Sequence, residues 1–348
     1  MCGEKGRTGR VDQNLSLGEV ESRTSQGEIA AEPVQSGDPT SPWLTAPKKA
    51  LPGIRKVLGQ SEYTANLGCH TWLNGVYWIN VLAVRPNGEL LIENLHDGGK
   101  IKMPHVQTVI EPDLVYPLLR GRDVQRWHAE PSAHIILTNR TDKLAGIPEA
   151  EMKRRWPKTF AYLKQFEGDS EKPARGTLRG RSGYRRYFKP SDPFYSIYDV
   201  GPYTMARWKV VWREQSSMFQ AAFAGLRSQR AMLPDHKLMM VPCASRQEAD
   251  FLLGTLNSSP SVLAIHSYVI STSTSTHILS NIAVPQFKKA DSNHTRLAEL
   301  SNQCHAAKRK NRQDEVATLE AEIDKVAAGI WGISDVELKA IQKALADM

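Results

Sequence analysis

A basic and aromatic stretch from Lys172 to Arg213 constrains this chain more than any other feature. Its first eighteen residues contain seven basic side chains and no acidic one, and Gly176, Gly180 and Gly183 interrupt the segment. Glycine at such short intervals disfavours one regular helix, so we expect a loop-rich segment. The basic residues are Lys172, Arg175, Arg179, Arg181, Arg185, Arg186 and Lys189.

Aromatic residues overlap with this basic run and continue beyond it. They are Tyr184, Tyr187, Phe188, Phe194, Tyr195, Tyr198, Tyr203, Trp208 and Trp212. Arginine forks match phosphates and the edge of guanine, and aromatic faces stack on bases. The combination is what a nucleic-acid-reading site needs. A solvated basic loop that leads into an ordinary core strand is the alternative interpretation.

The net charge of +8 is unevenly distributed along the 348 residues. Residues 1–47 carry four basic and seven acidic side chains, whereas the remainder carries 41 basic and 30 acidic ones. Residues 1–47 are also poor in aromatic residues and rich in Gly, Ser, Glu, Gln and Thr, so we predict that they are disordered. The rest is strongly basic, which favours a polyanionic partner.

The four cysteines form no CxxC pair, so the sequence supports neither a disulfide framework nor a zinc site. No apolar run approaches the ~18 residues that a membrane span requires. The N-terminus lacks the apolar core of a signal peptide. We therefore expect a soluble cytoplasmic protein with no membrane partner.

Local patterns predict a mixed, β-rich α+β fold with peripheral helices and a C-terminal helical pair. Strands are expected at 76–84, 89–95, 106–110, 133–137, 207–213, 237–243 and 281–287, the first two joined as a hairpin through Pro86-Asn87-Gly88. Helices are expected at 148–166, after the capping box that begins at Ser245, and through the last fifty-odd residues. A short helix would aim Arg122 and Arg126 the same way.

Several stretches together resemble one known family. They are Tyr116-Pro-Leu-Leu-Arg-Gly-Arg-Asp-Val-Gln-Arg-Trp127, Pro193-Phe-Tyr-Ser-Ile-Tyr-Asp-Val-Gly-Pro-Tyr-Thr204, Lys209-Val-Val-Trp-Arg213, Leu253-Gly-Thr-Leu-Asn-Ser-Ser259 and Ile282-Ala-Val-Pro-Gln-Phe287. In order and spacing they are similar to the TaqI-like C-terminal specificity domain of adenine-specific DNA methyltransferases and restriction-modification enzymes. The resemblance covers about residues 50–348. It implies a DNA target-recognition domain over 48–292 and a helical segment over 293–348.

The motifs for methyl transfer in that family are absent from this sequence. No Pro-Pro dipeptide occurs, so the Asn/Asp-Pro-Pro-Tyr/Phe loop that receives the target adenine is missing, and so is a glycine-rich loop for S-adenosylmethionine. The chain therefore resembles the DNA-reading part of such an enzyme. It would be a fragment, a split gene product or a stand-alone subunit, with no cofactor of its own and a separate catalytic subunit that uses S-adenosylmethionine.

The leading hypothesis is a recognition module for double-stranded DNA, with no catalytic or metal-binding residue in this chain. Besides the seven basic residues of 172–189, the candidate DNA-binding residues are Arg120, Arg122, Arg126, Tyr187, Arg207 and Lys209. Two alternatives stay open. One is a metal-dependent nuclease that uses Asp192, Asp199, Glu214 and Lys209, although the Asp/Glu-x-Lys pattern lacks its carboxylate. The other is an RNA-binding or structural protein.

Overall fold

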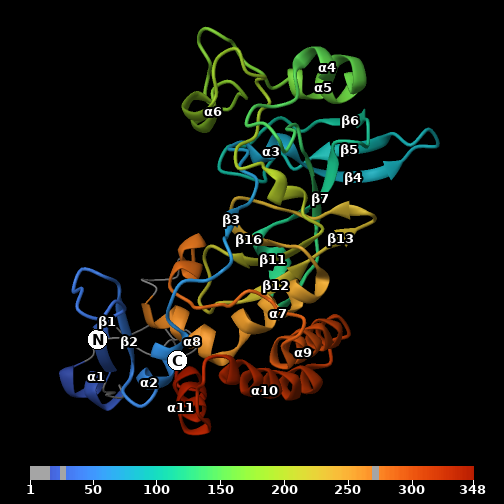
Figure 1. The fold of residues 1–348 in the computed structure, drawn as a ribbon. Coiled ribbons are helices and arrows are strands. Elements are labelled where there is room, and N and C mark those ends of the chain that lie inside the picture. Colours follow the sequence, from blue (N-terminus) through green and yellow to red (C-terminus); the bar gives the residue numbers. More distant parts are fainter. Residues whose placement is uncertain (1–15, 24–28, 269–273) are drawn as a thin grey trace.

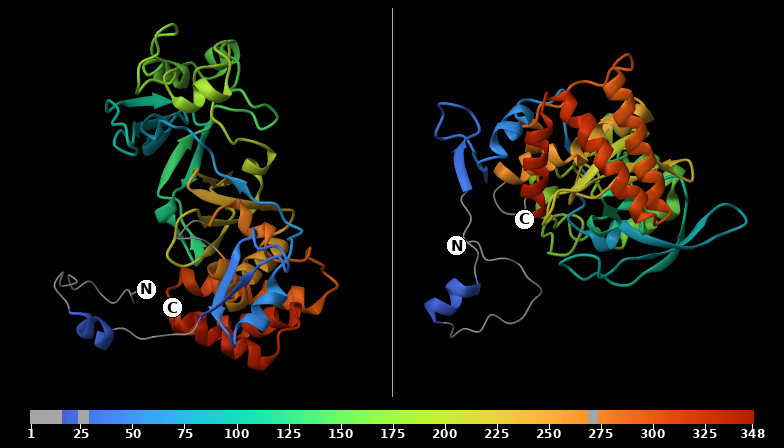
Figure 2. Two further views of the ribbon diagram at one scale, coloured as in Figure 1. Left: turned by 90° about the vertical axis from the view of Figure 1, so that its left-hand side faces the viewer. Right: turned by 90° about the horizontal axis from the view of Figure 1, so that it is seen from below.

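The computed structural model describes residues 16–23, 29–268 and 274–348. The molecule is elongated, with an upper and a lower lobe stacked along its length (Figures 1 and 2). Each lobe is organised around a six-stranded sheet, and helices pack beside both sheets. The predicted α+β class is confirmed.

The upper lobe contains a sheet with the strand order β15-β7-β10-β4-β5-β6. All neighbours in it are antiparallel except β15 and β7. The strands are β4 (Trp78–Val84), β5 (Leu90–Asn94), β6 (Gln107–Ile110), β7 (Val115–Leu119), β10 (Ala133–Ile136) and β15 (Leu233–Pro234). The helices of this lobe are α3 (Asn74–Tyr77), α4 (Glu149–Arg155), α5 (Pro157–Lys164) and α6 (Ser182–Tyr187).

Local signals placed much of the upper lobe correctly. The hairpin of β4 and β5 turns at Pro86-Asn87-Gly88, where Gly88 adopts a φ of +83° that favours glycine. The helix expected over 148–166 is divided into α4 and α5 because Pro157 lacks an amide hydrogen and begins a new helix. Met152 and Leu163 of these helices, and Trp156 between them, are buried in the upper core.

The lower lobe contains a sheet with the strand order β3-β16-β11-β12-β9-β8. Its strands are β3 (Asn66–Leu67), β8 (Val124–Gln125), β9 (Trp127–Ala129), β11 (Trp208–Arg213), β12 (Ala221–Ala224) and β16 (Leu238–Cys243). Its helices are α2 (Leu51–Val57), α7 (Arg246–Asn257), α8 (Ser259–Tyr268), α9 (Ser292–Arg309), α10 (Gln313–Ile330) and α11 (Asp335–Ala346). The last three cover the bottom of the molecule (Figure 2).

The predicted capping residues do begin helices. Ser245 accepts a hydrogen bond from the amide of Glu248 at 3.0 Å, and α7 ends at Asn257. Ser334 and Glu337 form the reciprocal capping box of α11. Side chains alternate along β11, because Val210 and Trp212 enter the lower core while Val211 faces a second cluster.

Part of the segment 1–47, for which disorder is predicted, forms a helix and two strands in the structure; residues 1–15 and 24–28 lie outside the described residues. β1 (Ile29–Pro33) and β2 (Trp43–Pro47) form an antiparallel hairpin, and α1 (Leu17–Arg23) precedes it. Leu44 is fully buried in the lower core, and the Thr45 hydroxyl donates to the carbonyl of Ser267 in α8 at 3.0 Å. This hairpin is ordered because α8 supplies an apolar partner for it.

Two further expectations differ from the structure. Residues 281–287 form a single bridge between Leu58 and Ile282 and no strand, and Pro285 has no amide hydrogen to extend a ladder. The C-terminal helical pair is three helices, α9, α10 and α11. These helices share the lower core with Leu44 and Trp212. Residues from the segments 1–47, 48–292 and 293–348 therefore pack in one core.

A smaller apolar cluster connects the two lobes. It contains Leu119 at the end of β7, Met232 before β15, and Val211 and Met240 from the lower sheet. The short hairpin of β13 (Leu226–Arg227) and β14 (Arg230–Ala231) has two residues in each strand. The 3-10 helices are Gly121–Asp123, Pro202–Met205 and Thr276–Ser280. Among the residues that the structure covers, no helix is long and apolar enough to cross a membrane.

Candidate nucleic-acid interface

The basic segment 172–189 folds as a loop that carries the short helix α6 at one end of the upper lobe (Figure 1). Arg181 holds this loop in place. It is only 4% exposed, and its guanidinium donates to the carbonyl oxygens of Leu178, Thr71, Phe194 and Ser196 at 2.7–3.0 Å. A guanidinium with its donors used in this way holds the loop together, and the DNA contact of Arg181 stays a prediction.

Arg179 also serves the loop. Its guanidinium forms an ion pair with Glu167 at 2.8 Å, and its backbone amide donates to the Glu167 carbonyl. The amide of Leu178 donates to the carbonyl of Phe166 next to it. These bonds close the base of the loop, and they leave Arg179 with its charge neutralised by a partner.

The other cations of the segment are free on the surface. Arg185 and Arg186 in α6, Lys189 after it, and Lys172 and Arg175 before it are exposed. None of these five side chains has an ion-pair partner among the described residues. They can therefore meet phosphates without first breaking an internal contact.

Five rings form a continuous stack beside α6, which we call the ring stack: His236, His70, Trp72, Tyr187 and Tyr198. His70 stacks between His236, at 4.3 Å between centroids, and Trp72, at 4.1 Å. Tyr187 lies 5.8 Å from Trp72 and 4.2 Å from Tyr198. All five are half-buried or exposed, and Arg186 lies over the Tyr187 ring at 5.2 Å.

Backbone geometry brings these distant rings together. His70 and Tyr198 exchange backbone hydrogen bonds of 3.0 and 3.2 Å, which fixes the segment after β3 against the segment before the second 3-10 helix. Gly183 in α6 packs directly on Trp72, since a Cβ at that position would lie 2.0 Å from the indole. Only glycine allows α6 to approach the ring stack so closely.

The ring stack is uncharged at neutral pH. Burial lowers the pKa of His70 to about 3 and that of His236 to about 4, so both imidazoles are neutral. The stack thus offers ring faces and hydrogen-bonding nitrogens, while Arg185, Arg186 and Lys189 supply the positive charge. Bases stack on such faces, and phosphates bind such cations.

Most of the other predicted residues serve the fold. Arg120 is buried, donates to the Ser132 hydroxyl and lies 3.5 Å from Asp123. Arg126 binds Glu320 in α10 at 2.5 Å and the Asn257 carbonyl at 2.6 Å. Lys209 is fully buried, and its ammonium donates to the carbonyls of Ala206 and Met232. All three side chains make contacts within the fold, and their contact with DNA stays a prediction.

Arg122 and Arg207 are exposed, but neither lies in α6 or its loop. The helix expected to align Arg122 with Arg126 is absent: the 3-10 helix ends at Asp123, and β8 and β9 follow. Arg185, Arg186 and Tyr187 lie in α6 and Lys189 follows it, and their contact with DNA stays a prediction. Arg207 lines a separate pocket.

Sequence reasoning missed His70, Trp72 and His236. They lie far from the basic segment along the chain. No spacing rule connects residue 70 with residues 187 and 236, because the contact depends on the pairing of two irregular segments. The odd density of rings in His70-Thr-Trp72 was the one available signal.

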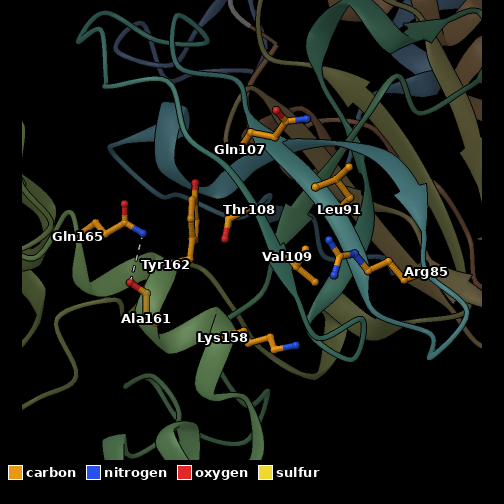
Figure 3. Close-up of a pocket in the computed structure, with 9 residues that line it drawn as sticks. All are labelled: Arg85, Leu91, Gln107, Thr108, Val109, Lys158, Ala161, Tyr162 and Gln165. Carbon is orange, nitrogen blue, oxygen red and sulfur yellow. Dashed lines mark hydrogen bonds between the residues drawn. The ribbon is translucent and has the colours of Figure 1, made fainter.

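A broad hollow of about 690 Å³ lies elsewhere in the upper lobe, between α5 and strands β5 and β6 (Figure 3). Some of its polar side chains make contacts within the fold. Lys158 pairs with Glu89, and the Tyr162 hydroxyl donates to the Val76 carbonyl at 2.6 Å. The described residues also contain no group of three or more His, Cys, Asp and Glu side chains that could hold a metal ion.

Comparison with known proteins shows a distant similarity to a solved structure. No protein-family model and no curated protein matches the chain. Among solved structures, the chain is similar to the Type IIL restriction-modification enzyme MmeI in complex with DNA, with 11% sequence identity and a TM-score of 0.45. The match covers 83% of this chain and 36% of the MmeI chain, so the present chain spans about a third of that enzyme's length.

Proposed function

We propose that this chain is a DNA-binding, target-recognition module of a restriction-modification system of the adenine-methylating kind. The observation that carries the proposal is the surface made by Arg185, Arg186 and Lys189 beside the ring stack. It combines cations that have no ion-pair partner in the described part of the chain with aromatic faces that are accessible. Both are features of nucleic-acid-binding surfaces.

The two kinds of group have different roles in this proposal. The cations neutralise phosphates and release counterions, which provides affinity with little sequence information. The arginine forks also match the O6 and N7 edge of guanine, so Arg185 or Arg186 would contribute to base readout. The rings pack against sugars or against a base that has left the helical stack.

The adenine-methylating part of the proposal rests on the sequence resemblance of residues 50–348 to TaqI-like specificity domains. Because the sequence lacks the Asn/Asp-Pro-Pro-Tyr/Phe loop, the chemistry belongs to a separate or missing domain that uses S-adenosylmethionine. We expect no methyl transfer from the purified chain alone. Transfer to duplex DNA by this chain without another protein would contradict the assignment of a recognition module.

Duplex binding is tested by fluorescence anisotropy with a short labelled duplex across a salt titration. We expect the combined variant Arg185→Ala, Arg186→Ala and Lys189→Ala to bind at least about tenfold more weakly at low salt. The slope of log K against log salt should become shallower by about 2–3, since each phosphate contact contributes roughly 0.9. Affinity is lost because phosphate contacts are removed. The substitutions themselves should not affect folding, because all three side chains are exposed.

The matched control removes three exposed cations elsewhere in the upper lobe, Lys100, Lys143 and Arg154, none of which has a partner in the described ranges. The control variant should keep most of the affinity and slope. If both variants lose the same affinity, binding follows net charge and not this surface. If neither loses any, the surface does not bind duplex DNA.

An RNA- or single-strand-binding protein is the second candidate, and the ring stack favours it specifically. Unpaired bases present both faces for stacking, so single strands use aromatic platforms more than duplexes do. Competition of duplex DNA, single-stranded DNA and RNA for the same labelled probe separates the two functions. Preference for the duplex supports the target-recognition module, and preference for either single strand supports the alternative.

A further inference from the structure

A second basic pocket is lined by residues in and next to β9 and β13, at the start of α7 and at the end of α9, and Figure 1 shows β13 and α9 away from α6. We call it the arginine pocket. It encloses about 450 Å³, within the usual range for small-molecule sites of roughly 300–1,000 Å³. Four arginines line it, each from a different part of the chain: Arg207, Arg227, Arg246 and Arg309.

Two of the four arginines have no acidic partner. Arg227 pairs with Glu130, the one acidic residue in the lining, at 2.8 Å, and Arg246 pairs with Asp250 at 2.7 Å. Arg207 and Arg309 are exposed and form no ion pair with any residue in the described ranges. The pocket therefore carries uncompensated positive charge on two planar guanidinium groups, whose geometry matches the oxygens of a phosphate or a carboxylate.

Flat rings form the rest of the arginine pocket. Trp208 and Phe223 lie 6.1 Å apart and both line it, with Arg207 over the indole at 4.7 Å and Arg246 over the phenyl ring at 3.8 Å. Such guanidinium–ring pairs present one further flat face to a ligand. A planar heterocycle can stack on such a surface, as bases do on aromatic residues and arginine.

His305 adds a hydrogen-bonding group of defined polarity. Its Nδ1 lies 2.8 Å from the carbonyl oxygen of Trp127, so Nδ1 carries the proton and donates. Burial lowers the pKa of His305 to about 4, so the ring is neutral and Nε2 is left as an acceptor. An acceptor beside ring faces fits the amino or imino hydrogens of a nucleobase.

We propose that the arginine pocket binds a single nucleotide unit, with its phosphate on Arg207 and Arg309 and its base against Trp208, Phe223 and His305. The unit is a free mononucleotide or one nucleotide of a nucleic-acid strand, since both present the same phosphate and base. The pocket is separate from the ring stack, so this assignment does not depend on duplex binding by α6.

Isothermal titration calorimetry of the full chain with each deoxynucleoside 5′-monophosphate and with inorganic phosphate tests the proposal. We expect at least one nucleotide to bind at submillimolar concentration and inorganic phosphate to bind about tenfold more weakly, because it lacks the base. The double variant Arg207→Ala and Arg309→Ala should lose about tenfold or more in affinity for the nucleotide. His305→Gln should weaken the binding of the nucleotide and leave the affinity for inorganic phosphate unchanged.

The control Lys143→Ala and Arg154→Ala removes two exposed cations from the upper lobe and should bind as the wild type does. Equal affinity for phosphate and nucleotides, or no nucleotide binding up to roughly 10 mM, overturns the proposal. The two sources of the nucleotide are separated by anisotropy with labelled DNA. Weaker DNA binding by the double variant identifies a nucleotide of a strand, and unchanged DNA binding identifies a free mononucleotide.

Discussion

Asp235 is a buried carboxyl group whose ionisation should make stability depend on pH. It is 3% exposed, it accepts one hydrogen bond from the Lys237 amide at 2.9 Å, and burial raises its pKa to about 7. A raised pKa means that the folded state holds the proton more tightly than the unfolded state. The stabilisation is complete below about pH 4 and is lost as the pH rises through 7.

Asp235→Asn removes this titration and keeps the acceptor for the Lys237 amide. Between pH 5 and pH 8, the free energy of unfolding of the variant relative to wild type should rise by on the order of 2–3 kcal/mol. Urea unfolding at both pH values measures the difference, in which contributions common to both proteins cancel. The same substitution at the exposed Asp142 is the control. A constant difference across this pH range would contradict a raised pKa for Asp235.

Two arginines four residues apart show what sequence cannot tell about single residues. Arg181 and Arg185 occupy the same basic run, yet one is buried and the other is exposed. The difference depends on the carbonyls of Thr71, Phe194 and Ser196, which surround Arg181 and come from distant parts of the chain. Composition predicted a basic surface correctly, but only tertiary contacts decide which cations belong to it.

The contact of α6 with the ring stack makes a prediction at the scale of one element. Gly183→Ala places a methyl group 2.0 Å from the Trp72 indole, so α6 or the indole must move. Helix propensity alone favours alanine by about 0.5–1 kcal/mol. We expect the steric effect to dominate, with a loss of about 1–3 kcal/mol and weaker nucleic-acid binding.

Thermal unfolding and near-ultraviolet circular dichroism measure the two consequences of Gly183→Ala. The control is Gly121→Ala, since nothing lies within 4 Å of a Cβ at Gly121 and its φ is not positive. A Gly183→Ala variant as stable as wild type, with unchanged aromatic signals, would show that α6 does not rest on Trp72 as described.

Elements were predictable where their signals are local. The Pro86-Asn87-Gly88 turn and the capping serines of α7 and α11 are complete within a few residues, and these elements occur as expected. The hairpin of β1 and β2 was missed because its order depends on α8, more than two hundred residues away. The ring stack was missed for the same reason, since its rings come from three separate segments.

The whole molecule has an upper and a lower core, and the junction between them decides whether the lobes unfold together. β7 of the upper sheet leads to β8 and β9 of the lower sheet, and β15 leads directly to β16. Leu119, Met232 and Met240 form part of the apolar cluster at this junction. Lys209 from the lower sheet donates there to the Met232 carbonyl. These shared contacts couple the cores.

We therefore expect one cooperative unfolding transition. Ile92→Ala in the upper core and Ile323→Ala in the lower core remove side chains that are 0% and 1% exposed, at a cost of about 2–5 kcal/mol each. Each should lower the midpoint of the same calorimetric transition and speed amide exchange in both lobes. Val336→Ala, at a position that is 79% exposed, should do neither. Two transitions, each shifted only by the variant in its own core, would instead mean that the junction does not couple the lobes.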